Sequence, residues 1–231
     1  NPVNIMGASK KLMEELIMAY SDKLKITTAR FANVAFSNGS LPQGFLERLG
    51  KSQPWSCPLG IRRFFVSPQE SGELCMIASV LGESGDIIFP KLDEERDMIS
   101  FDSIARDLLR YLGLEADVCR SETEAKVKAE GLNEYSKSYP VYFFETDTSG
   151  EKPYEEFFTD SEIIDEDRFM NLGVIKNSVK RDLREIDDIF ARLRQLFDSG
   201  NVSKASIVDI LKTWLPDFDH IEKGKGLDSK M

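Results

Sequence analysis

Met6 and Lys10, near the start of the chain, are spaced to act together on one ligand. From residue 4 to about residue 20, apolar side chains recur every three or four positions, which predicts an amphipathic helix. A spacing of four places Met6 and Lys10 one above the other on the same helix face. An ammonium group donates hydrogen bonds, whereas a thioether exchanges no proton at neutral pH. Taken alone, the pair is more typical of a surface lysine on an ordinary helix.

A second group of candidates follows a short segment with the composition of a strand. Residues 25–31 form a short segment rich in β-branched side chains, which predicts a strand, and a Gly/Ser loop follows them. Open α/β sheets bind ligands beyond the carboxyl ends of their parallel strands. A plain β-turn is the alternative. The candidates in this loop are Asn33, Val34, Ala35, Phe36, Ser37 and Ser40.

Arg62 and Arg63 form a third candidate group, immediately before a helix signal. Ser67, Pro68 and Glu70 have the spacing of a capping box, which predicts a helix that runs to about residue 81. Guanidinium groups and a helix N-terminus both suit a bound phosphate. A solvated basic pair is the alternative. Further along, Gly150, Glu151, Lys152, Glu155 and Glu156 form a compact charged turn that is also compatible with a solvated loop.

The elements that would position these residues alternate between strands and helices. Strands are predicted at 63–66, 86–89 and 141–144, and helices at 42–49, 102–112, 178–198 and 203–214. Residues 120–139 are charged and loosely helical in pattern, and residues 151–177 are acidic and irregular. The alternation favours an α/β fold with parallel strands. We place a boundary near residue 115, between an α/β part (1–115) and an acidic α/β and helical part (116–231).

Composition excludes several classes of function. A net charge of −10 argues against nucleic acid and anionic membranes as partners. Three dispersed cysteines and one histidine leave almost no ligands for a zinc site, so we expect no metal. The sparse cysteines suit the cytoplasm, and no apolar run has membrane length. The first residue is Asn1 and a helix pattern begins at once, so we expect the chain to be the C-terminal part of a longer protein.

Together, these segments resemble the polysaccharide-biosynthesis dehydratases, extended short-chain dehydrogenase/reductases that act on UDP-N-acetylhexosamines. The tail resembles the subgroup of UDP-N-acetylglucosamine 4,6-dehydratases associated with legionaminic-acid-type sugars. The resemblance implies the C-terminal part of a Rossmann-like doubly wound sheet and a small, mostly helical C-terminal substrate lobe. The segments that carry it are 1–10, 29–40, 63–67, 88–91, 150–156, 175–177 and 215–218.

The resemblance also implies roles for the candidate residues. Lys10 occupies the lysine position of the superfamily's Tyr-x-x-x-Lys motif and would hold the nicotinamide ribose, while Met6 occupies the tyrosine position without its proton. Residues 34–37 would contact the nicotinamide side of a tightly bound NAD or NADP. The substrate residues would be Asn33 and Ser40 at the sugar-phosphate site and Arg62 and Arg63 near the pyrophosphate. Where relatives often carry an arginine two residues before Gly150, this chain has Thr148.

The implied reaction converts UDP-N-acetylglucosamine to a UDP-4-keto-6-deoxy-N-acetylhexosamine with loss of one water. The cofactor would be regenerated in each cycle, and the full-length protein is expected to be a homo-oligomer. One alternative is a nucleotide-sugar epimerase or reductase on the same scaffold. Another is an inactive fragment that acts only as a binding module, because the chain contains no Gly-x-Gly-x-x-Gly cofactor loop.

Overall fold

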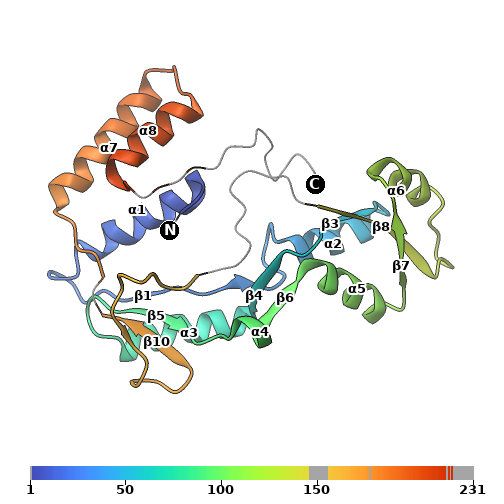
Figure 1. Ribbon diagram of the computed structural model, residues 1–231, viewed down its shortest axis with the longest axis horizontal. Helices are drawn as coiled ribbons and strands as arrows, with labels where there is room; N and C mark the ends of the chain where they lie inside the picture. The colour runs from blue at the N-terminus through green and yellow to red at the C-terminus, as the bar shows by residue number, and fades with distance from the viewer. Residues whose placement is uncertain (1, 146–155, 177, 217, 219, 221–231) are drawn as a thin grey trace.

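The computed structural model describes residues 2–145, 156–176, 178–216, 218 and 220 (Figure 1). The helices of this part are α1 (Ile5–Met18), α2 (Leu41–Gly50), α3 (Pro68–Leu81), α4 (Glu94–Asp97), α5 (Phe101–Tyr111), α6 (Glu122–Ala129), α7 (Leu183–Asp198) and α8 (Lys204–Trp214). The strands are β1 (Thr28–Ala29), β2 (Asn33–Val34), β3 (Trp55–Pro58), β4 (Arg62–Val66), β5 (Ile87–Pro90), β6 (Met98–Ser100), β7 (Glu115–Cys119), β8 (Ser138–Phe144), β9 (Ile164–Asp165) and β10 (Leu172–Ile175).

These strands form three small sheets. The first has the order β1-β5-β10-β9, with β1 parallel to β5 and the other pairs antiparallel. The second has the order β2-β4-β6, with β2 parallel to β4 and β6 antiparallel to it. The third, β3-β8-β7, is parallel throughout. The α/β fold with parallel strand pairs that the sequence predicts is therefore confirmed.

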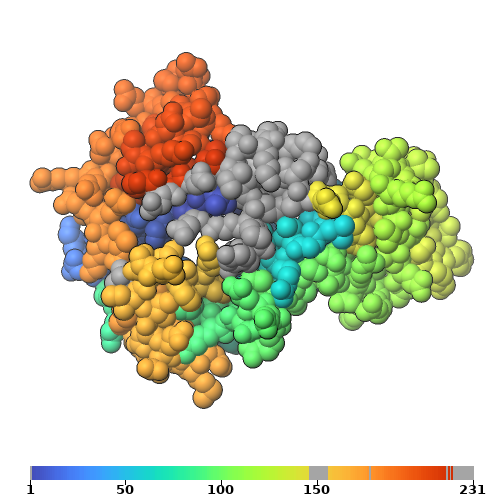
Figure 2. Space-filling view, in the orientation of Figure 1, coloured from blue at the N-terminus to red at the C-terminus, as the bar shows by residue number. Residues whose placement is uncertain are grey.

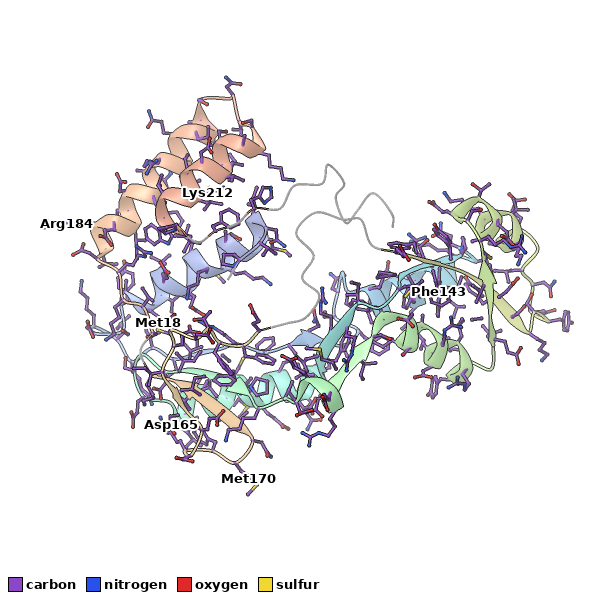
Figure 3. All side chains as sticks on the ribbon, in the orientation of Figure 1. Met18, Phe143, Asp165, Met170, Arg184 and Lys212 are labelled. Atoms are coloured by element: carbon purple, nitrogen blue, oxygen red, sulfur yellow. The ribbon has the colours of Figure 1, made fainter. Side chains whose placement is uncertain are left out.

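Helices cover both faces of the first sheet, and the side chains of β5 show why. Successive residues of a strand point to opposite faces of its sheet. Ile87 and Phe89 pack with Met18 at the end of α1, whereas Ile88 packs with residues of α3. Figure 3 shows Met18 where α1 meets this sheet. A buried strand with two apolar faces is typical of a sheet between two helix layers.

The third sheet belongs to a separate lobe on the right of Figure 1, together with α2, α5 and α6. Its core is apolar and aromatic: the Phe45 and Trp55 rings stack at a centroid distance of 4.6 Å, and Tyr139 lies against the same indole. Leu109 of α5 and Val141 of β8 belong to the same buried cluster. The lobe therefore has its own hydrophobic core.

The tail helices α7 and α8 lie against α1, where Figure 2 shows them as an orange and red mass over the blue N-terminal helix. Two buried clusters join them. Ala8 packs with Val208 and Leu211, and Leu12 packs with residues of α7 and with Trp214. α1 is thus placed between the first sheet and the tail.

Several predicted elements are confirmed and others are wrong. The capping box forms at Ser67 and Glu70, and the helix that it begins ends at Leu81 as predicted. The expectation that residues 151–177 are irregular is wrong for its described part, because β9 and β10 lie there and β10 pairs with β5. Strands β3 and β7 are not among the predicted elements. The division near residue 115 stays a prediction, and strands from both sides of it pair with each other.

Candidate functional site

α1 presents the predicted pair, Met6 and Lys10, on an exposed face. The helix begins where Asn4 caps it, with the Asn4 side chain accepting a hydrogen bond from the Gly7 amide at 2.7 Å. Met6 is 61% exposed, and Lys10 is exposed without an ion pair to any other described residue. The Lys10 ammonium is therefore available to a ligand.

Arg30 anchors this helix to the first sheet. All five guanidinium N–H groups of Arg30 have acceptors: both carboxylate oxygens of Glu14, both of Glu162, and the Phe157 carbonyl, at 2.7–3.0 Å. Glu14 lies one helical turn after Lys10, so this contact fixes the part of α1 that carries the lysine. Sequence reasoning missed the role of Arg30. The available signal was an arginine within the strand predicted at 25–31, where a charged side chain needs a nearby carboxylate.

The electrostatics of this contact favour the charged state of every partner. Burial alone would raise the pKa of Glu14 and of Glu162, but the hydrogen bonds and charge of Arg30 outweigh it and hold both pKa values below the usual range. Burial alone would lower the pKa of Arg30, and its two carboxylate partners raise it instead. At neutral pH, Glu14, Glu162 and Arg30 are therefore all charged and form a three-membered ion-pair network.

The loop after β1 lies beside the segment that carries the two predicted arginines. In the parallel pair of β2 and β4, Asn33 is opposite Phe65, and the Asn33 amide donates to the Phe64 carbonyl at 3.3 Å. The Ala35 amide donates to the Val66 carbonyl at 2.9 Å. Phe36 then adopts a left-handed backbone with φ of 55° and is exposed. The structure thus brings the 33–37 and 62–66 segments together, as expected if both line one site.

Arg62 and Arg63 make contacts within the chain. The Arg62 guanidinium donates to the carbonyls of Glu94 and Glu95 in the short helix α4 and of Met98, the C-cap of that helix. Arg63 is 9% exposed and donates to the carbonyl of Arg62. Their role as phosphate ligands stays a prediction, and a phosphate would compete with these carbonyls for Arg62.

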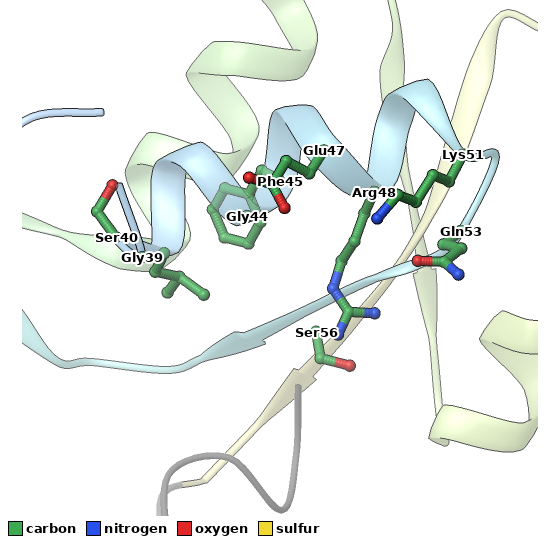
Figure 4. Close-up of a pocket in the computed structure, with 10 residues that line it drawn as sticks. Gly39, Ser40, Gly44, Phe45, Glu47, Arg48, Lys51, Gln53 and Ser56 are labelled. Carbon is green, nitrogen blue, oxygen red and sulfur yellow. The ribbon is translucent and has the colours of Figure 1, made fainter. Parts of the chain in front are cut away.

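Ser40 caps α2 and lines a pocket of about 270 Å³ (Figure 4). The Ser40 hydroxyl accepts from the Gln43 amide at 3.3 Å. Arg48 and Lys51, on the last turn of α2 and just beyond it, line the same pocket. The sequence did not single out these two cations, because nothing in their spacing distinguishes them from a solvated helix end.

The described residues contain no group of three or more potential metal ligands. All three cysteines are free, and burial raises the pKa of the Cys57 thiol. Across the described part of the chain, every helix is too short or too polar to cross a bilayer. The charged turn at 150–155 lies outside the described residues, with Thr148, and Glu156 is exposed at its end.

Comparison with known proteins identifies the family. A family model described as polysaccharide biosynthesis protein matches residues 1–176, and the chain belongs to this family. The match covers α1, the three sheets and the loop at 33–37, and it ends before α7.

Among curated proteins, the capsular polysaccharide biosynthesis protein CapD of Staphylococcus aureus is 24% identical over 162 residues, covering 68% of this chain and 26% of that protein. UDP-glucose 4-epimerase of Rickettsia bellii is 27% identical over 167 residues, covering 62% of this chain and 49% of the epimerase. The chain thus spans a quarter to a half of these relatives.

Among solved structures, the X-ray structure of Pen from Bacillus thuringiensis is similar to 79% of this chain and to 50% of that one, with a TM-score of 0.57 and 21% identity. At this identity the likeness shows the fold.

Proposed function

We propose that this chain is part of a nucleotide-sugar 4,6-dehydratase that converts UDP-N-acetylglucosamine to a UDP-4-keto-6-deoxy-N-acetylhexosamine, with loss of one water. The observation that carries the proposal is the exposed Lys10 on a helix that Arg30 anchors. Arg30 directly precedes the segment that contains Asn33 and the turn at 34–37. Arg30 thus connects both the helix that carries Lys10 and the candidate loop to the same edge of the first sheet. Membership of the polysaccharide-biosynthesis family supports the assignment.

The residues present fit one end of a nicotinamide cofactor. A bound nicotinamide supplies reversible hydride transfer and is restored within each cycle. Lys10, whose ammonium is exposed, fits the ribose hydroxyls as a hydrogen-bond donor, and the turn at 34–37 is the proposed contact on the nicotinamide side. The sequence holds no glycine-rich loop for the pyrophosphate, so the fit concerns the nicotinamide ribose alone.

On the substrate side, we assign Asn33 and Ser40 to the sugar-phosphate end. The pocket beside Ser40 supports this, because Arg48 and Lys51 line it and cations suit a diphosphate. Met6 would pack beside the sugar, and its thioether leaves the proton transfers at the sugar to other groups. We place the reaction in the cytoplasm and the full-length protein in a homo-oligomer, which light scattering would test.

A second candidate is a nucleotide-sugar 4-epimerase, and the relatives named UDP-glucose 4-epimerase favour it. The two reactions differ in mass. A dehydratase product is lighter than its substrate by one water, whereas an epimerase product keeps the substrate's mass. The choice therefore needs one spectrum of the product.

The test uses the protein at its full natural length, incubated with UDP-N-acetylglucosamine and followed by mass spectrometry and proton NMR. We expect loss of one water and a new methyl signal at C6. Lys10→Ala should abolish most of the activity, whereas Lys25→Ala, which removes another exposed lysine, should leave it intact. An unchanged mass with a shifted H4 signal would establish the epimerase instead. No conversion of any UDP-hexosamine would contradict both.

A further inference from the structure

α1 carries two consecutive carboxylates, Glu14 and Glu15, and a different arginine holds each. Glu14 meets Arg30 from the sheet side. Glu15 is 3% exposed and accepts from Arg181 Nε at 2.6 Å. A buried carboxylate is strongly unfavourable without a partner, so the Arg181 contact sets where this turn of α1 lies.

Arg181 connects α1 to the far end of the tail. Its second arm, Nη2, donates to the carbonyl of Trp214 at 3.0 Å, and its guanidinium lies over the Trp214 ring at 4.5 Å. Trp214 is the last residue of α8 and is 4% exposed. A planar guanidinium can bind a carboxylate and a carbonyl while stacking on an indole, which an ammonium cannot do. This one side chain, just before α7, thus contacts both α1 and the last residue of α8.

The tail lies behind the face that carries Lys10. Ala8 and Leu12 pack on α7 and α8, and Glu15 continues the same stripe. At 100° per residue, Lys10 is about 200° round the helix from both Ala8 and Leu12. The apolar contacts hold this rear face without fixing its register along the tail, because apolar packing is not directional. The Arg181–Glu15 contact is directional and supplies that register.

We propose that Arg181 is a positioning residue, which acts through Glu15 and Trp214 to set the position of α1 and therefore of Lys10. The inference rests on the proposed function, in which Lys10 contacts the cofactor. Arg181 and the tail helices follow the last residue matched by the family model, residue 176, so the tail side of this contact lies outside the matched region, whereas Glu15 lies inside it. The contact assigns the tail a role in the reaction although none of the proposed substrate residues belongs to the tail.

The test compares Arg181→Gln, the double variant Glu15→Gln/Arg181→Gln and the control Arg192→Gln in the full-length protein. Arg192 also joins α7 to α8, through the Thr213 hydroxyl at 2.9 Å, but among the described residues it forms no hydrogen bond or ion pair with α1. For Arg181→Gln we expect kcat per cofactor-loaded subunit to fall on the order of tenfold, since small misplacements of reacting groups cost up to about a hundredfold. KM should stay within about twofold, because the substrate residues that we propose lie outside the tail.

The double variant separates positioning from stability. Removing both charges relieves the unpaired buried carboxylate, so the Tm should return toward the wild-type value. The kcat should stay low, because the shorter glutamine side chain at position 181 cannot contact both residue 15 and the Trp214 carbonyl. Arg181→Lys, which keeps a cation beside Glu15, should also lower kcat, and it replaces Arg181→Gln if that variant does not fold.

The outcomes are distinct. Recovery of kcat together with Tm in the double variant would show a purely stabilising contact and overturn the inference. Equal activity of Arg181→Gln and Arg192→Gln in an active enzyme would overturn it as well and leave the proposed function standing. A wild-type protein that converts no UDP-sugar would remove the proposed function and this inference with it.

Discussion

In the region built on β1, β5 and β10, charged side chains connect elements that are far apart in the chain. Asp86, just before β5, is 3% exposed at its side chain and accepts from Lys176 at 2.8 Å and from Arg168 at 2.7 Å. In the β3-β8-β7 lobe, it is aromatic and aliphatic side chains that connect elements far apart in the chain. The ion pair of Lys128 with Asp117 lies at the lobe's surface, with both side chains about a third exposed.

The polar atoms of the two regions differ in the same way. The buried hydroxyl of Tyr139 in the lobe donates to the Gln53 carbonyl at 2.7 Å, and burial raises its pKa to about 12, so it stays neutral. The sheet region instead buries carboxylates whose partners are cations. We therefore expect the stability of the sheet region to depend on pH and on long-range charge pairing, and the stability of the lobe to depend on the volume of its core.

The largest effect is expected from Trp55→Ala in the lobe. The Trp55 side chain is fully buried between Phe45 and Tyr139. Its removal leaves a cavity and should cost about 4 kcal/mol of unfolding free energy. Hydrogen exchange should rise across β3, β7 and β8, while β1, β5 and β10 keep their protection. Trp55→Phe, which fills most of the space, is the control, and equal loss of protection in both regions would contradict the separation.

Asp86→Asn is the corresponding change in the sheet region. The variant keeps the shape of the side chain but removes the charge that Lys176 and Arg168 face. Since both cations are partly exposed, we expect a loss of about 2 kcal/mol, within the range of charged hydrogen bonds. Urea unfolding measures it. The surface variant Asp117→Asn, which faces Lys128 in the lobe, should cost less than about 1 kcal/mol, and an equal cost for the two would refute the contrast.

Acid should weaken the sheet region before the lobe. In the folded protein the pKa values of Asp86, Glu14 and Glu162 lie below their usual range, because the cationic partners outweigh burial. Their contribution is therefore complete above the unfolded values of about 4 and is lost as the pH falls through the folded values. The Trp55→Phe and Trp214→Phe variants each leave one tryptophan to report. The Trp214 signal, on the tail packed against α1, should change at a higher pH than the Trp55 signal, and coincident transitions would contradict this.

The sequence predicts those parts of this architecture that depend on local patterns. The amphipathic period of α1 and the capping box at Ser67 involve neighbours in the chain, and both are confirmed. The pairing of β10 with β5 was not predictable, because its logic is tertiary: Gly173 faces the ring of Phe89 so closely that a Cβ would collide with it. A lone glycine in an acidic segment carries no such signal.

The same limit applies to the candidate site. Lys10 and the loop at 33–37 can be proposed as candidates from the sequence because their residue types and order are local motifs. The partners of Arg30 at positions 14 and 162 are separated by 148 positions in the chain (162 − 14), and only the fold brings them together. Arg62 shows the converse: a basic pair before a capped helix predicts phosphate, whereas the contacts of this arginine with three backbone carbonyls are set by the position of α4.

The smallest effect tests whether local interactions are alike in the two regions. Ser67 begins α3 against the first sheet, and Ser121 begins α6 in the lobe. Each hydroxyl accepts from the backbone amide three residues later, at 3.1 Å in both cases. Ser67→Ala and Ser121→Ala should therefore each cost about 1 kcal/mol, the usual value of an N-cap, in urea unfolding followed by circular dichroism. If the two substitutions lower the free energy of unfolding equally, the two regions differ only in their tertiary contacts. A cost at Ser67 several times that at Ser121 would mean that the sheet region is also more sensitive to its helix ends, because a displaced α3 would disturb the contacts of Leu74 and Ala78 with Ile88.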